Sequence, residues 1–456
     1  MIYSVRNHPL IARLLARLQA SPLGYRLVSG AFWSLIAVAL PKAISLVGFV
    51  LVARTLGKEG FGALGVIQNT VGMLGTFAGF GFGITATKYV SHYRYSDPGK
   101  AGRIVALSLM VSGVVAAIIS LLLIVGAPYV ASTWLASEAL TVPLRMSTIL
   151  LVLYAVNGVQ MGALAGMEAF RESAVVSAWV SVFSLVAILG ALWGVEGATC
   201  SLVITAGVSC VVSGRALRRI AASQGIAIEL KGAWAERNTL IGYSLPAVLA
   251  NALYTPAFWF CTMLLVNTRD GYTQMGEFNA ANQWRSVAML IPSVLGQAAI
   301  PIVSDCCANG RRSEAVAMLW SLFKGLALIG VPISFLLFLA SGPIMSSYGS
   351  GYSGGWMTFC LLQAAVLLQV LQSPVIKYIE ATGRLWLNLT FNLGQAIAMI
   401  GSSCILVNKG AKGLALALLL SFVVHSVWLF IYAIRVSISI RQKAECVSLT
   451  TDLSTL

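Results

Sequence analysis

Runs of about 20 apolar or small residues recur along almost the whole chain, and they limit its fold more than any motif does. A helix of that length, rising 1.5 Å per residue, crosses the roughly 30 Å hydrocarbon core of a bilayer. The chain is 58% hydrophobic and 10% charged, whereas a soluble domain carries about 25% charged residues. Strands of a transmembrane barrel alternate apolar and polar residues over about 10 positions, which excludes that architecture. The sequence therefore predicts an all-α polytopic membrane protein.

The apolar runs predict about twelve transmembrane helices. Because this number is even, both ends of the chain are expected on the same side of the membrane. The expected spans are 30–53, 62–86, 104–127, 143–166, 174–194, 197–215, 239–266, 276–301, 315–340, 356–379, 386–408 and 412–435.

The distribution of basic residues indicates which side holds the termini. Of the 30 Lys and Arg residues, 21 fall on the side of the termini, six on the other side and three inside spans. Loops rich in Lys and Arg stay in the cytoplasm, so both termini are expected there. The net charge of +15 does not indicate nucleic-acid binding, because the bases are not gathered in one basic domain with stacking aromatic residues.

The longest connection between spans divides the chain into two sets of six helices. The N-terminal segment is basic and amphipathic without a cleavable signal, so we expect it to lie on the inner membrane surface. The expected organisation is an amphipathic cytoplasmic N-terminal segment 1–28, an N-terminal lobe 29–215, a cytoplasmic linker 216–238, a C-terminal lobe 239–435 and a cytoplasmic tail 436–456.

An internal repeat relates the two halves. The segment "LVARTLGKEGFGALGVIQN" (51–69) follows the first span, and "LVNTRDGYTQMGEFNAANQ" (265–283) follows the seventh. Because each half contains an even number of spans, the repeats are expected to be parallel, related by an axis along the membrane normal. Pro41 has a near counterpart in Pro256, and both are candidate points of helix bending. At a constant offset of 214 the segments share Leu51/Leu265, Val52/Val266, Gly57/Gly271 and Gly62/Gly276.

Two motifs carry a resemblance to a known family. The stretch "ARTLGKEGFGALGVIQNTVGMLGTFAGFGFGITATKYVS" (53–91) resembles the N-terminal signature of the Wzx-type lipid-linked oligosaccharide flippases. The stretch "GEFNAANQWRSVAMLIPSVLGQAAIPIVSD" (276–305) is similar to the segment that opens their second half. These flippases share a superfamily with the MATE multidrug transporters. The resemblance implies two six-helix lobes that face each other around a central cavity and alternate between inward-open and outward-open forms.

Three bases fall inside the expected spans: Lys42, Arg285 and Lys324. A charged side chain in the membrane is costly, about 2.5–3.5 kcal/mol on insertion scales, and marks a function or a buried partner. The alternatives are a backbone carbonyl freed by Pro41 as the partner of Lys42, interhelical packing for Arg285, and snorkelling to the surface for Lys324. Because an anionic cargo would offset their charge, we expect the three bases to bind a diphosphate in the cavity.

No acidic residue lies at the centre of a span, and only Glu277 and Glu380 approach span ends. A cation-coupled antiporter usually needs a carboxylate inside the membrane. We therefore expect neither glutamate to be essential for transport.

Side-chain amides are the candidate contacts for sugar hydroxyls. They recur on one face of their expected helices, although hydrogen bonds between helices would explain them equally well. These residues are Asn157 and Gln160, Asn279 and Asn282, and Asn388, Asn392 and Gln395.

We interpret the chain as a flippase that moves an undecaprenyl-diphosphate-linked oligosaccharide, an O-antigen or related polysaccharide repeat unit, across the inner membrane. One alternative is a MATE-like cation-coupled drug or metabolite antiporter. Another is a membrane polysaccharide polymerase or ligase, which would need a large periplasmic loop that the span layout lacks. We expect no catalytic residue, no cofactor, no metal site and no nucleic-acid partner. The candidate partners are the lipid-linked substrate, membrane lipids, and polysaccharide polymerase and chain-length proteins.

Overall fold

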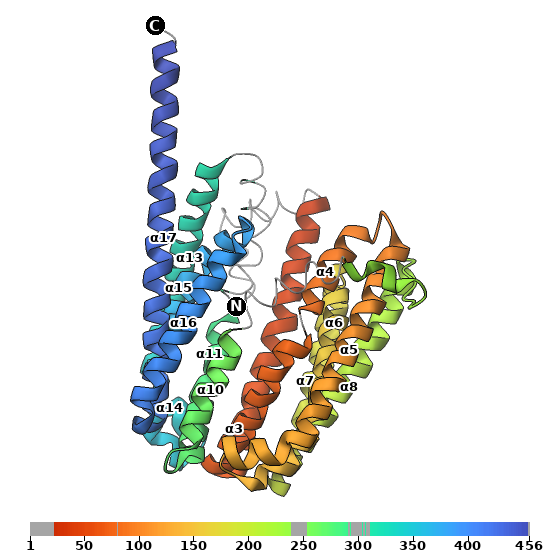
Figure 1. Ribbon diagram of the computed structural model, residues 1–456, viewed down its shortest axis with the longest axis vertical. Helices are drawn as coiled ribbons and strands as arrows, with labels where there is room; N and C mark the ends of the chain where they lie inside the picture. The colour runs from red at the N-terminus through yellow and green to blue at the C-terminus, as the bar shows by residue number, and fades with distance from the viewer. Residues whose placement is uncertain are drawn as a thin grey trace, which may run out of the picture.

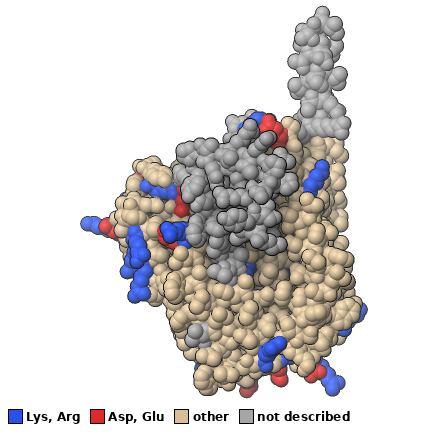
Figure 2. Space-filling view, turned by 180° about the vertical axis from the view of Figure 1, so that it is seen from behind, with Lys and Arg blue, Asp and Glu red and all other residues tan. Residues whose placement is uncertain are grey.

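The computed structural model describes residues 22–79, 81–238, 253–290, 292, 303, 306 and 311–454. The regular elements in these residues are all helical, as the sequence predicts. Seven helices of this part of the chain are long and apolar enough to cross a membrane. Figure 2 shows charged atoms gathered toward the two ends of the molecule, with an uncharged surface between them.

The N-terminal helices form one group (Figure 1). Their order follows the expected spans closely. The elements are α3 (Pro22–Gly79), α4 (Phe82–Tyr93), α5 (Pro98–Tyr129), η1 (Val130–Trp134), η2 (Glu138–Leu140), α6 (Thr141–Gly166), α7 (Phe170–Ala187), η3 (Ile188–Trp193), α8 (Gly194–Ser223) and η4 (Ala233–Glu236).

The first two spans are separate helices, as the sequence predicts, although their ends differ. We expected helices over 30–53 and 62–86, and within α3 two helices meet at Gly57, where the backbone is non-helical (φ 68°, ψ −179°) and after which the second helix runs to Gly79. Glycine adopts this left-handed conformation without a Cβ clash, so the chain bends there without a loop. A second left-handed glycine, Gly81, then precedes α4.

The helix that precedes the expected linker extends into it. We expected the linker to begin at residue 216, and α8 continues as a helix to Ser223. The segment "RALRRIAAS" (215–223) is rich in Ala, Arg and Leu, which favour helix, so the helix extends past the apolar run.

The C-terminal helices form a second group (Figure 1). The last helix, α17, continues without a break to Ser454, past residue 435, where we expected the last span to end and the tail to begin. Residues 1–21, 239–252 and most of 289–301, which we assigned to the N-terminal segment and to two spans, lie outside the described residues. The elements are α10 (Tyr254–Val266), α11 (Gly271–Ala288), α13 (Arg312–Leu339), α14 (Ser341–Ser347), η5 (Ser350–Gly355), α15 (Trp356–Ala381), α16 (Leu385–Leu406), η6 (Val407–Lys409) and α17 (Gly410–Ser454).

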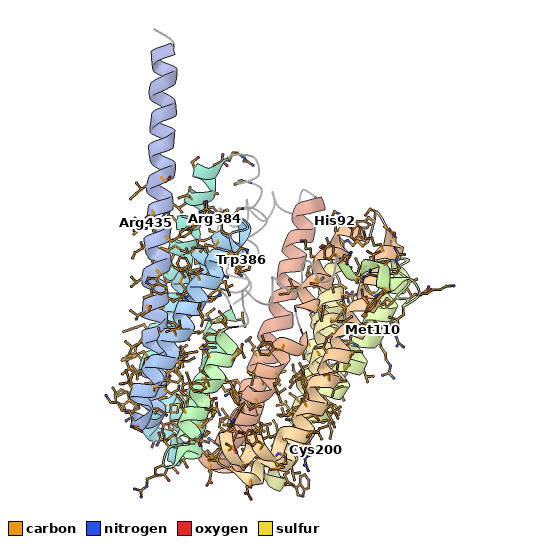
Figure 3. The ribbon with its side chains drawn as sticks, viewed as in Figure 1. His92, Met110, Cys200, Arg384, Trp386 and Arg435 are labelled. Atoms are coloured by element: carbon orange, nitrogen blue, oxygen red, sulfur yellow. The ribbon has the colours of Figure 1, made fainter. Side chains whose placement is uncertain are left out.

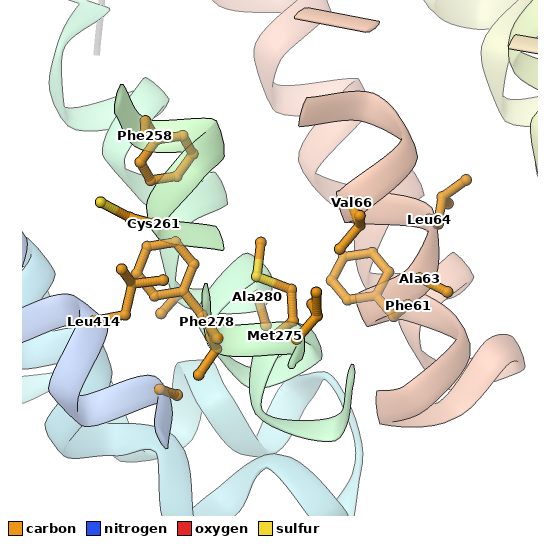
Figure 4. Close-up of a cluster of buried hydrophobic side chains, with 14 of the residues drawn as sticks. Phe61, Ala63, Leu64, Val66, Phe258, Cys261, Met275, Phe278, Ala280 and Leu414 are labelled. Atoms are coloured by element: carbon orange, nitrogen blue, oxygen red, sulfur yellow. The ribbon is translucent and has the colours of Figure 1, made fainter. Parts of the chain in front are cut away.

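The two groups meet at one end of the molecule and diverge toward the other (Figure 1). They meet where residues 57–66 of α3 pack on residues 271–281 of α11, and we call these residues the contact end. A buried apolar cluster joins the groups there, with Phe61 and Val66 from α3 and Met275 and Phe278 from α11 (Figure 4). At the opposite end lie His92, Arg384 and Arg435, whereas Cys200 lies near the contact end (Figure 3). We call that opposite end the base-rich end.

Candidate functional site: the contact end and the intramembrane bases

Glycines bring the backbones of α3 and α11 into direct contact. A Cβ atom added to Gly62 would collide with the carbonyl oxygen of Tyr272, and one added to Gly276 would collide with the carbonyl oxygen of Lys58. Small residues permit such close approach of membrane helices. Any larger side chain at either position would therefore push the two helix groups apart.

The two glycine contacts are reciprocal under the sequence repeat. Lys58 and Tyr272 are 214 residues apart, and so are Gly62 and Gly276. The offset of 214 that aligns the two halves therefore converts one contact into the other. Gly65 and Asn279 are separated by the same offset, and a Cβ atom on Gly65 would collide with the Asn279 amide. When two equivalent surfaces meet about a two-fold axis, residue i contacts j and j contacts i.

An ion pair crosses the contact end. Lys58 Nζ lies 3.1 Å from Glu277 Oε2, and Thr358 Oγ1 donates a hydrogen bond of 2.8 Å to Glu277 Oε1. The Lys58 ammonium also lies 5.5 Å from the centre of the Tyr352 ring. Because the Glu277 side chain is only 10% exposed, its charge needs these partners in order to be stable there.

Further hydrogen bonds connect the two groups. Most of them run from a side chain to a backbone carbonyl, and all of their acceptors are uncharged. The bonds are Arg54 Nε to the Ser347 carbonyl (2.7 Å), Tyr272 Oη to the Leu135 carbonyl (2.6 Å) and Asn267 Nδ2 to the Trp134 carbonyl (2.7 Å). Trp259 Nε1 also donates to Thr70 Oγ1 (2.9 Å).

Sequence reasoning missed the roles of Lys58 and Glu277. We placed Lys58 in a loop and expected Glu277 to be dispensable at a span end, but the structure pairs the two across the contact end. The signal that could have found them was the repeat. Equivalent segments that carry matching glycines are the segments expected to meet at a two-fold axis.

The three predicted bases lie on three different helices of the two groups. Lys42 is half-buried in α3, and no carboxylate of the described residues lies within ion-pair distance of it. Arg285 of α11 donates a 2.6 Å hydrogen bond to the Tyr254 hydroxyl. Lys324 is exposed on α13. Among the described residues, no hydrogen bond or ion pair joins these three side chains, so their meeting on a cargo remains a prediction.

A cavity of about 370 Å³ lies inside the N-terminal group, between α3, α6, α7 and α8. Pro41, which precedes Lys42, lines it, and so does Asn157. The side-chain oxygen Oδ1 of Asn157 accepts a 2.6 Å hydrogen bond from the Ser213 hydroxyl. The cavity is bordered by neutral hydroxyl and amide groups: Ser45, Gln68, Tyr154, Asn157, Ser177, Ser181, Ser184, Ser201, Thr205 and Ser209.

The other predicted amides are mostly buried between helices. Gln160 lies against Gly214 in the N-terminal group, and Asn279 lies against Gly65 at the contact end. Asn388 and Gln395 are buried in α16. The other two amides, Asn282 in α11 and Asn392 in α16, are each half-buried. Interhelical packing therefore describes Gln160, Asn279, Asn388 and Gln395 in this conformation.

Comparison with known proteins identifies the family. A model of the polysaccharide biosynthesis protein family matches residues 27–306. The "EPS I polysaccharide export inner membrane protein EpsE" of Ralstonia nicotianae is 24% identical over 393 residues, which are 84% of this chain and 87% of that protein.

Solved structures of similar fold are transporters. An inward-facing multidrug resistance MATE family transporter of the MOP superfamily superimposes with a TM-score of 0.71 at 14% identity, covering 89% of this chain and 98% of that one. The eukaryotic MATE transporter AtDTX14 has the same TM-score and identity, covering 92% and 99%. Because the family match covers more than half of the chain, the protein belongs to the polysaccharide biosynthesis protein family, with the fold of the MATE-like transporters.

Proposed function

We propose that the protein is a flippase that moves an undecaprenyl-diphosphate-linked oligosaccharide from the cytoplasmic to the periplasmic leaflet of the bacterial inner membrane. It makes and breaks no covalent bond. The family assignment and the similarity to a polysaccharide export inner membrane protein support this proposal. The cargo is an O-antigen or related polysaccharide repeat unit.

The observation that carries the proposal is the reciprocal contact between repeat-related segments at the contact end. In our proposal, lobes 29–215 and 239–435 hold six transmembrane helices each, as parallel repeats around a central cavity. Alternating access is then a rocking of one lobe against the other about the axis that relates them. The contact end closes the periplasmic side, and the termini lie on the cytoplasmic side with most of the bases.

The intramembrane bases supply the site for the diphosphate. Arg285 has the neutral Tyr254 hydroxyl as its hydrogen-bond partner, so this contact leaves the guanidinium charge available to an anion. Lys42 comes from the other lobe, and Lys324 adds a third positive charge. Charge-assisted hydrogen bonds to phosphate oxygens are among the strongest that side chains make.

The carboxylate that would best suit a cation-coupled antiporter is already engaged. Glu277 is the described acidic side chain buried between the two groups, and both its oxygens have partners in Lys58 and Thr358. This pairing favours a structural role for Glu277 at the contact end over a role in carrying a proton or sodium ion.

Substitution of Lys42 tests the cargo assignment. Lys42→Ala should abolish surface glycan while the protein still inserts, and Lys42→Arg should keep part of the activity because it keeps the charge. Adding Arg285→Ala to Lys42→Ala should do no further harm if both bind one diphosphate. Lys412→Ala, which removes an exposed lysine at the very end of an expected span, is the matched control. Normal export by Lys42→Ala would refute the assignment.

Reporter fusions test the orientation independently. Fusions ending near Arg215 and Arg311 should report the cytoplasm, and those near Lys58 and Lys409 should report the periplasm. A periplasmic signal from the 216–238 connection would reverse the layout.

A further inference from the structure

A groove of about 340 Å³ lies between α7 and α8 in the N-terminal group. It combines charged and apolar walls, in contrast to the neutral cavity inside the same group. Its lining residues are Arg171, Glu172, Val175, Val176, Val212, Arg215, Ala216 and Arg219.

The polar wall of the groove is positively charged. Arg215 and Arg219 are four residues apart on α8, so they share one face of that helix. Arg171 faces the groove from the first turn of α7, where the helix terminus adds a partial positive charge. With one acid, Glu172, the formal charge of the lining is +2. Arg219 and its two arginine neighbours in the groove are exposed, so a ligand can reach them.

An apolar surface continues from the groove along α7. Val175, Trp179 and Val182 lie at spacings of four and three residues on one face and are 46%, 67% and 52% exposed. On α8, Val211 and Ile204 are likewise about half exposed and share a face with Arg215. Arginines at one end of an exposed apolar stripe match a molecule that has an anionic head and a hydrocarbon tail.

We propose that this groove binds an anionic membrane phospholipid. Its phosphate lies among Arg171, Arg215 and Arg219, and an acyl chain lies along the stripe from Val175 to Val182. A soluble anion would leave the apolar wall unused. The stripe is exposed on the outside of its helix group, where the surrounding lipid reaches it. The inference concerns a lipid that stays with the protein and does not depend on which cargo the protein carries.

Ordinary membrane topology would also place arginines at this end of the helices, and Arg218 separates the two explanations. Arg218 is exposed on the same turn of α8 but does not line the groove. If the arginines only attracted an anionic membrane surface in general, Arg218 would contribute as much as Arg215 and Arg219. A site would use Arg215 and Arg219 of α8, together with Arg171 of α7, but not Arg218.

The test measures lipid retention by native mass spectrometry of the purified full-length protein with phosphatidylglycerol or zwitterionic phosphatidylcholine. We expect preferential retention of phosphatidylglycerol. The double variant Arg215→Ala/Arg219→Ala should weaken it about fivefold for each arginine removed. Arg215→Lys/Arg219→Lys should keep most of it. The control Arg218→Ala/Arg237→Ala removes two exposed charges outside the groove and should retain the lipid as the native protein does.

Three results would overturn the proposal: equal retention of the two lipids by the native protein, equal loss in both alanine doubles, or displacement of phosphatidylglycerol by farnesyl diphosphate. The last would assign the groove to a prenyl diphosphate instead. Thermal unfolding without added lipid checks that the alanine doubles are folded. Because Lys42→Ala should leave lipid retention unchanged, failure here is separable from failure of the proposed transport function.

Discussion

Two buried glutamates make ion pairs at opposite ends of the molecule, and they differ in what they join. At the contact end, Glu277 pairs with Lys58 across the two helix groups. At the base-rich end, Glu236 of η4 pairs with Lys100 at 3.8 Å and Arg103 at 3.3 Å, both on α5. Both glutamate side chains are 10% exposed. The two glutamates are thus equally buried and both ion-paired, but one pair lies between the two groups and the other lies within one group.

The difference separates a contact that must break from one that must persist. The Glu236 pairs hold the connection after α8 against its own group, where Gly102 also packs on the Ala227 carbonyl. The Glu277 pair holds two groups together, so lobe separation would break it. Lys58 remains 21% exposed, and water can therefore replace part of its interaction when the pair opens.

Glycine substitution at the contact end should give the largest effect. In Gly62→Ala or Gly276→Ala the new Cβ overlaps a carbonyl oxygen, and overpacking of this kind costs about 1–3 kcal/mol. The closed contact should lose population by about 5- to 150-fold. Met275 is fully buried in this contact. When Met275→Cys is added, labelling of that cysteine by a membrane-impermeant thiol reagent measures how often the contact opens.

Gly126 provides the control for this substitution, because an added Cβ there meets no atom within 4 Å. Gly126→Ala should leave labelling and surface glycan unchanged. Unaltered labelling in Gly62→Ala would show that the backbones do not need this close approach.

Removing the charge of the interlobe pair should have an intermediate effect. Glu277→Gln leaves Lys58 without its partner and should raise labelling at position 275 by about tenfold. Glu236→Gln, which breaks pairs within one group, should not change labelling at that position. The charge swap Lys58→Glu/Glu277→Lys should restore closure in part. If Glu277 instead carried a coupling proton, the swap would restore no transport.

Loss of one neutral hydrogen bond should give the smallest effect. Tyr272→Phe removes the bond to the Leu135 carbonyl, which is worth about 1 kcal/mol, so labelling should rise about fivefold. Tyr352→Phe is the matched control, because the hydroxyl of this buried tyrosine has no hydrogen-bond partner among the described residues. Equal effects of the two changes would argue against a specific contribution of the Tyr272 bond.

Much of the helical fold follows from the sequence because bilayer thickness sets the length of an apolar run. The runs at 104–127, 143–166 and 356–379 match α5, α6 and α15 to within a few residues at most ends. The family also follows from two motifs, and the family match confirms it. Apolar length predicts the two helices on either side of Gly57, but it does not fix where helices end, because α8 continues to Ser223 and α17 to Ser454, past the ends of their apolar runs.

The contact end was harder to predict because its contacts are distant in sequence. Lys58 and Glu277 lie 219 residues apart, and each alone looks like an ordinary charge near the end of a span. The intramembrane bases pose the opposite problem. Their positions in apolar runs are plain in the sequence, but whether Lys42 and Arg285 meet on a cargo depends on a ligand and on the conformation that holds it.

The central claim is that the two ends of the molecule open in turn, and distances between paired spin labels test it most directly. One pair, Glu138→Cys with Lys409→Cys, spans the groups near the contact end. The other, His92→Cys with Trp386→Cys, spans them at the base-rich end (Figure 3). In lipid discs, adding lipid-linked oligosaccharide should produce a longer distance in the first pair together with a shorter distance in the second. Distances that stay fixed at both ends in export-competent protein, or that lengthen at both ends together, would contradict alternating access.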